Sequence, residues 1–216
     1  MSIDLITQTA EYVKATMAQE GTGHDWFHIE RVWRLAKTIQ AQEGGNLEVV
    51  ELAALLHDIA DWKFSDGDEN AGRRVSREWL VQIGATSRIV DLVCEIVGDL
   101  SYKGSGVPDE MKTLEGQIVQ DADRLDAIGA IGIARCFAYG GYKNMPLYDP
   151  DIKPGVHTSF DEYKKKKGTT FNHFYEKLFL LKDRLHTRAA KKIAQGRDSY
   201  MREFVGRFLK EWEAKD

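Results

Sequence analysis

A histidine and two carboxylates stand close together near position 58 of the sequence. An apolar, helix-forming run ends in His57 and Asp58, and Asp61 follows about one helical turn later, with Lys63 just beyond it. An imidazole nitrogen and carboxylate oxygens together suit a borderline divalent metal such as Mn, Fe, Co or Zn. The alternative is a helix end whose polar residues enter solvent, so a metal site requires further ligands elsewhere in the chain.

His28 is a second candidate ligand. It shares an apolar stripe with Val32 and Leu35 at helical spacing, and Arg31 lies on nearly the same face. A single histidine on an apolar face is more often a packed core residue than a ligand. The arginine is harder to explain in this way, because burying a guanidinium without an anion costs free energy.

Two further carboxylates, Asp123 and Asp126, lie one turn apart in a stretch rich in small residues. The helical neighbours of Asp123 are mostly apolar, which predicts that it points toward a packed face. Two carboxylates on one buried face repel each other unless a cation or a proton lies between them. The alternative is an exposed acidic turn in which Arg124 pairs locally.

Helices must position the four candidate ligands, which are His28, His57, Asp58 and Asp123. Between glycine and proline breaks, apolar residues recur at helical spacing almost throughout, and no alternating stretch indicates a strand. Asp25 is a plausible N-cap for the helix that carries His28. Metal sites built from side chains of several helices are typical of helical proteins. The predicted helices span residues 6–17, 26–42, 47–60, 72–83, 86–97, 114–139, 171–194 and 199–212.

Length and charge narrow the class of protein. A chain of 216 residues with 43% hydrophobic residues predicts one globular domain, and a net charge of −4 argues against a nucleic-acid surface. The N-terminal residues carry no long apolar region, so we expect neither a signal peptide nor a membrane span. Cys94 and Cys136 lie in apolar helical contexts, which favours buried free thiols and a cytoplasmic location. The sequence leaves an oligomer open.

The segment 141–170 is the irregular exception, with three of the four prolines and a run of lysines at 164–167. We expect it to be flexible. The lysine run is interpreted as a solvated loop rather than a nucleic-acid patch. The functional alternative is that this segment forms a flexible cap over a binding site.

Three motifs in order resemble those of the HD-domain superfamily of metal-dependent phosphohydrolases, in particular its small bacterial members. A His-Asp pair alone is weak evidence, but the three motifs in order are specific. The C-terminal region is similar as well, so that the resemblance covers most of the chain. The residues concerned are His24–Val32, Leu55–Asp61 and Asp121–Ala127, followed by Asn172–Leu178, Thr187 and Arg197.

The resemblance implies an all-α fold, a single HD domain over residues 1–216 whose helical bundle holds a metal between central helices. The implied ligands of one divalent ion (Mn, Mg, Fe, Co, Ni or Zn) are His28, His57, Asp58 and Asp123. Many two-metal members of this superfamily carry additional histidines between the second and third motifs. This sequence has no histidine between positions 57 and 157, so the resemblance favours one metal over two.

The resemblance also suggests roles for charged residues around the metal. Asp61 is the implied acceptor of a proton from water, with Asp126 as a second candidate or an outer-shell partner. Phosphate oxygens would be held by Arg31, Lys63 and Lys177, although a lysine on a surface helix is usually only solvated.

The expected substrate is a nucleotide. Aromatic residues near the motifs could pack on a base or simply fill the core; they are Trp26, Phe27, Trp62 and Phe64. Three reactions remain open: a nucleoside triphosphate gives monophosphate and pyrophosphate, a monophosphate loses its phosphate, or a cyclic diester opens. The resemblance favours the first. A nucleotide or metal sensor without turnover, and a helical module without a site, are the alternatives from other classes.

Overall fold

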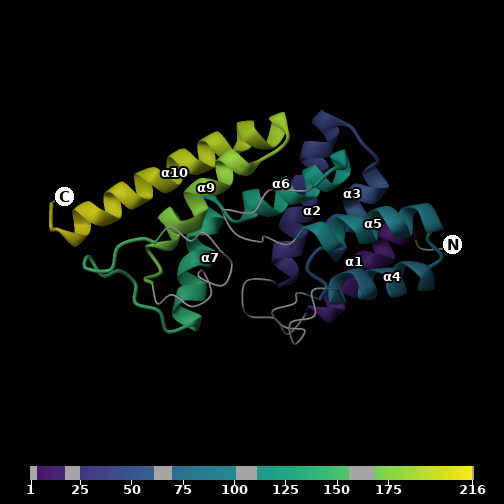
Figure 1. Cartoon of the computed structure of the whole chain (residues 1–216), viewed down its shortest axis with the longest axis horizontal. Coiled ribbons are helices and arrows are strands. Elements are labelled where there is room, and N and C mark those ends of the chain that lie inside the picture. The colour runs from purple at the N-terminus through teal and green to yellow at the C-terminus, as the bar shows by residue number, and fades with distance from the viewer. Residues whose placement is uncertain (1–3, 18–24, 61–69, 101–110, 156–167, 216) are drawn as a thin grey trace. The chain divides into compact units, whose positions relative to one another are not determined.

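The computed structural model describes residues 4–17, 25–60, 70–100, 111–155 and 168–215. Every regular element in these ranges is helical, which confirms the all-α prediction (Figure 1). None of the helices in the described ranges is both long and apolar enough to cross a membrane. Asp61, Trp62, Lys63, Phe64, His157 and the lysines at 164–167 lie outside the described residues.

The chain divides into two compact units. The first unit comprises residues 1–102 and 108–122, and the second comprises residues 103–107 and 123–216. The first unit contains the helices α1 (Leu5–Thr16), α2 (Trp26–Glu43), α3 (Leu47–Leu56), α4 (Ala71–Gln82) and α5 (Ser87–Asp99). The helix α6 (Leu114–Asp126) begins in the first unit and ends in the second.

The helix α3 lies at the centre of the first unit. All of its residues from Val49 to Leu56 are buried, and it contacts α1, α2 and α5. Because it is apolar on all sides, it can be covered by several neighbours at once. The helix ends at Leu56, four residues earlier than the pattern predicted, so that His57 and Asp58 stand directly at its C-terminal end.

The start of α2 is fixed by its N-cap, as the sequence predicted. The carboxylate of Asp25 accepts a hydrogen bond from the backbone N–H of His28 at 3.0 Å. This satisfies a donor that has no partner within the helix. The apolar stripe of α2 is fully buried at Ile29, Val32 and Ala36, and His28 is on the same buried side.

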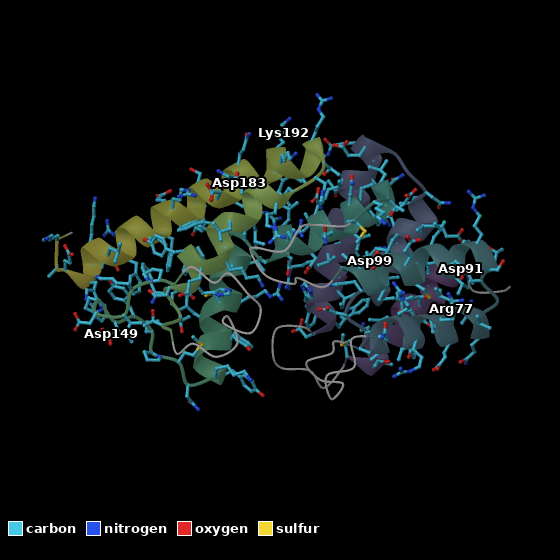
Figure 2. All side chains as sticks on the ribbon, in the orientation of Figure 1. Arg77, Asp91, Asp99, Asp149, Asp183 and Lys192 are labelled. Carbon is cyan, nitrogen blue, oxygen red and sulfur yellow. The ribbon has the colours of Figure 1, made fainter. Side chains whose placement is uncertain are left out.

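The helices α4 and α5 pack against each other through apolar side chains. Leu80 on α4 and Val93 on α5 are fully buried. At the surface, Arg77 and Asp91 form an ion pair of 2.8 Å between these helices (Figure 2). Both side chains are exposed, and solvent screens such a pair so that it contributes little to stability. The apolar contact therefore dominates this packing.

The second unit contains α7 (Gly129–Tyr142), a π-helical turn η2 (Phe174–Leu178), α9 (Phe179–Leu181), η3 (Lys182–Arg184) and α10 (Arg188–Trp212). An aromatic core joins α7, η2 and α10, with ring centroids 4.5–6.5 Å apart. The rings of this core are Phe137, Phe171, Phe174, Phe204 and Phe208.

The prediction of one long helix over residues 114–139 is wrong. The chain leaves the helix after Asp126: Ile128 is extended, and Gly129 has φ +80° before α7 begins. That left-handed conformation suits glycine because it has no Cβ. A Cβ at Gly132 would overlap the carbonyl oxygen of Ala127. The small residues therefore permit a tight corner between two helices rather than a continuous one.

The predicted boundaries of the C-terminal helices are also wrong. The chain becomes extended at Leu185, and α10 then runs without a break from Arg188 to Trp212. The hydroxyl of Thr187 accepts a hydrogen bond from the N–H of Ala190 at 3.3 Å and caps this helix. Gly196, which the sequence interpretation placed between two helices, lies inside α10. Its propensity cost of about 1 kcal/mol is smaller than the gain from packing the long helix.

Candidate metal centre

Three ligand atoms meet in the first unit at the distances expected for a metal site. The Nε2 atoms of His28 and His57 are 3.3 Å apart, and the Oδ2 atom of Asp58 is 3.5 Å from the first and 3.7 Å from the second. Ligands about 2.1 Å from one ion, at angles between octahedral and tetrahedral, lie about 3.0–3.4 Å apart. The three residues could therefore hold one divalent ion with only small shifts.

The end of α3 determines which nitrogen of His57 is available. The Nδ1 atom lies 2.8 Å from the carbonyl oxygen of Ala54. A carbonyl oxygen can only accept, so Nδ1 is the donor of this bond and Nε2 is the nitrogen that faces His28 and Asp58. Ala54 belongs to the last turn of α3, where carbonyl groups have no partner in the helix. The helix end thus supplies the outer-shell hydrogen bond that orients a metal-binding histidine.

The environment of the two rings is almost dry, and the carboxylate is more open. The side chains of His28 and His57 are 0% and 3% exposed, whereas that of Asp58 is 17% exposed. The rings are tilted by 68° with centroids 5.2 Å apart. Two unprotonated nitrogens in such a place would repel each other, and a proton or a cation between them would remove that repulsion. The arrangement therefore suits a cation reached from the Asp58 side.

Asp123 and Asp126 lie in the second unit, in the last turn of α6. Asp123 is half-buried, and its part in the metal site remains a prediction. Asp126 is 1% exposed and accepts a hydrogen bond from Nη1 of Arg135 at 2.7 Å. Arg124 is also buried. The alternative of an exposed acidic turn is therefore wrong.

The residues predicted to hold phosphate lie in different parts of the chain. Arg31 lies on α2, close to one turn after His28, and is half-buried. Lys177 lies in η2, in the second unit, where its charge acts on His173 and Cys136. Asp61 and Lys63 lie outside the described residues. Their roles remain predictions.

Sequence reasoning missed two arginine contacts in the second unit. The guanidinium of Arg124 donates to the carbonyl oxygen of Arg184, and that of Arg197 donates to the carbonyl oxygen of Leu125. It also missed Asp121, which is fully buried on α6. Its burial could have been inferred from its spacing to Leu125, four residues later on the same helical face.

His173 is predicted to make stability depend on pH. Burial, and secondarily the charge of Lys177, lowers the pKa of His173 from 6.5 to about 3. The unfolded chain therefore binds a proton below pH 6.5 that the folded chain excludes, and stability falls as the pH falls. Between pH 7 and pH 5 we expect a loss of about 2 kcal/mol from this group. Urea unfolding of the parent and His173→Gln should diverge by that amount; parallel pH profiles would contradict the prediction.

The chain belongs to the HD-domain family, whose profile matches residues 26–128. Its helical fold is that of the HD-superfamily hydrolases. The YpgQ protein of Bacillus subtilis is 37% identical over 205 residues, which cover 94% of this chain and 92% of YpgQ.

Solved structures agree with this assignment. A protein from Lactobacillus plantarum has a TM-score of 0.85 and 38% identity, covering 98% of this chain and 99% of its own. An HD-superfamily hydrolase from Bacillus thuringiensis has a TM-score of 0.76 and 42% identity, covering 97% of both chains. The structure of YpgQ in complex with ADP has a TM-score of 0.77 and 33% identity, covering 98% of this chain and 100% of YpgQ.

Proposed function

We propose that this protein is a metal-dependent phosphohydrolase that acts on nucleotides. The observation that carries the proposal is the triangle formed by the Nε2 atoms of His28 and His57 and the Oδ2 atom of Asp58. Membership of the HD-domain family supports hydrolysis. The complex of YpgQ with ADP supports a nucleotide as the ligand, because YpgQ is similar over almost the whole chain.

In this proposal, one divalent ion is held by His28, His57, Asp58 and Asp123. When bound, the ion would withdraw charge from phosphate oxygens and make a nearby water molecule more acidic. His57 keeps its Nε2 lone pair directed at the site because Ala54 holds the Nδ1 proton. The carboxylate of Asp58 supplies the negative charge that two neutral imidazoles lack.

The remaining roles concern the proton and the phosphate. Asp61 accepts a proton from the attacking water. Asp126 is the less favoured acceptor, because its carboxylate is already engaged in an ion pair with Arg135 at 2.7 Å. Arg31, Lys63 and Lys177 hold phosphate oxygens through charge-assisted hydrogen bonds. Arg31 is the best supported of these, because it shares α2 with His28.

Hydrolysis of a nucleoside triphosphate to a monophosphate and pyrophosphate is the leading reaction. We expect pyrophosphate from one or more triphosphates in a nucleotide panel with Mn²⁺, Mg²⁺ or Co²⁺. Removing the metal with a chelator should lower the rate at least 100-fold, because the ion lowers the activation free energy by several kcal/mol. Added Mn²⁺ should restore the rate. Ion-exchange chromatography and a phosphate assay identify the products. Phosphate release from monophosphates, or opening of cyclic diesters, would redirect the proposal to those bonds. Tight nucleotide binding with no product would favour a sensor.

A further inference from the structure

The last turn of α6, which carries Asp123, is held by a side chain from the C-terminal helix. The final carbonyl groups of a helix have no partner within it, and such turns fray easily. Here the carbonyl oxygen of Leu125 accepts hydrogen bonds from the N–H of Ile128 and from Nη1 of Arg197 on α10. The second bond joins residues that are 72 positions apart in the chain.

The side chain of Arg197 reaches Leu125 by passing over Gly129. A Cβ atom at Gly129 would lie 2.9 Å from Cγ of Arg197, and Gly129 itself has φ +80°. Glycine at this corner therefore provides both the left-handed turn and the space for the arginine stem. Burial lowers the pKa of Arg197, and the nearby charge of Asp126 opposes this effect. The guanidinium is thus held against the end of α6 rather than in solvent.

Other contacts leave this turn little freedom. Asp126 bonds Arg135 on α7 at 2.7 Å, and Arg124 donates to the carbonyl oxygen of Arg184. These contacts flank Asp123 on the C-terminal side, and each belongs to the second unit. Of them, the bond from Arg197 is the one made to the backbone of the turn itself.

We infer that Arg197 is a positioning residue for Asp123: by holding the backbone at Leu125, it orders the last turn of α6, which carries the Asp123 carboxylate. The inference rests on the proposed function, in which Asp123 is the fourth ligand. Arg197 itself contacts neither metal nor substrate in this account. Outer-shell residues that orient a ligand typically contribute 10- to 100-fold to metal affinity.

The test compares Arg197→Met with Arg202→Met. Arg202 lies on the same helix, and its side chain donates a hydrogen bond to the carboxylate of Asp198 at 2.8 Å. Calorimetric titration of the metal-free proteins with Mn²⁺ should show affinity about 10- to 100-fold lower for Arg197→Met and within about twofold of the parent for Arg202→Met. Hydrogen exchange at the Ala127 and Ile128 amides should accelerate only in Arg197→Met. Arg197→Lys should recover part of the loss, and it serves in place of Arg197→Met if that variant does not fold.

A double-mutant cycle separates positioning from general destabilisation. In an Asp123→Asn background, Arg197→Met should weaken Mn²⁺ binding no further, because the ligand it positions is gone. An equal loss in both backgrounds, or no loss in either, overturns the inference. If Asp123→Asn leaves Mn²⁺ affinity unchanged while His57→Ala abolishes it, the fourth ligand and its positioning both fail but the three-residue centre stands. If His57→Ala is also neutral, the proposed metal centre itself is wrong.

Discussion

Replacing His57 with alanine is expected to lower Mn²⁺ affinity by more than about 100-fold and nucleotide hydrolysis by at least about 1,000-fold. The imidazole supplies one of three ligand atoms that lie within 3.7 Å of one another. Removing a direct ligand should exceed the 10- to 100-fold effect of an outer-shell change. A bound cation contributes several kcal/mol to phosphoryl transfer, and each 1.4 kcal/mol is a factor of ten in rate.

The measurement is calorimetric titration with Mn²⁺ together with product release under saturating metal. Lys192→Ala is the control, because Lys192 is exposed on α10, lies in the second unit and is not one of the proposed site residues (Figure 2). It should retain Mn²⁺ affinity within about twofold. Circular dichroism should show unchanged helix content in both variants. If His57→Ala retains the Mn²⁺ affinity of the parent, the proposed metal centre is wrong.

Replacing Gly132 with alanine is expected to destabilise the protein by about 2–4 kcal/mol, although alanine is the better helix former. The added Cβ would overlap the carbonyl oxygen of Ala127, which belongs to the backbone and cannot rotate away. Either α7 must shift from the end of α6 or the corner between them must open. Both movements break contacts at residues 124–128 that hold Asp123 in place.

Gly206→Ala is the matched control for that substitution. Gly206 lies in α10, and an added Cβ there would meet no atom within 4 Å. We expect this variant to be more stable than the parent by about 0.5–1 kcal/mol, because alanine loses less backbone entropy in a helix. Urea unfolding of both variants tests the pair. Equal stability changes at the two positions would show that the corner is not tightly packed.

The sequence predicted the helical class because helix formation is encoded locally. Apolar residues at helical spacing and the Asp25 cap depend on neighbours within one or two turns. The start of α2 and the burial of His28 followed from them. The same local signal failed at Asp126–Gly129, because helical spacing does not reveal that Gly129 takes a left-handed conformation or that the Ala127 carbonyl lies against Gly132.

The candidate ligands His28, His57 and Asp58 could be nominated from residue type, spacing and family resemblance. Their convergence was expected from the family resemblance alone, because helical spacing does not show how α2 and α3 pack against each other. The tautomer of His57 likewise depends on where α3 ends and where the Ala54 carbonyl points. Asp123 could be nominated in the same way, and its place in the site remains a prediction.

What the sequence determined by itself was thus the helical class, the approximate extents of α1 to α5, and the residue types able to bind a metal. The tertiary structure decided which of those atoms meet, that Asp126 pairs with Arg135, and that Arg197 holds the backbone at Leu125. The physical reason is the separation along the chain over which each interaction acts. Periodicity and caps act over a few residues, whereas a distance between Nε2 atoms of residues 29 positions apart is set by the packing of whole helices.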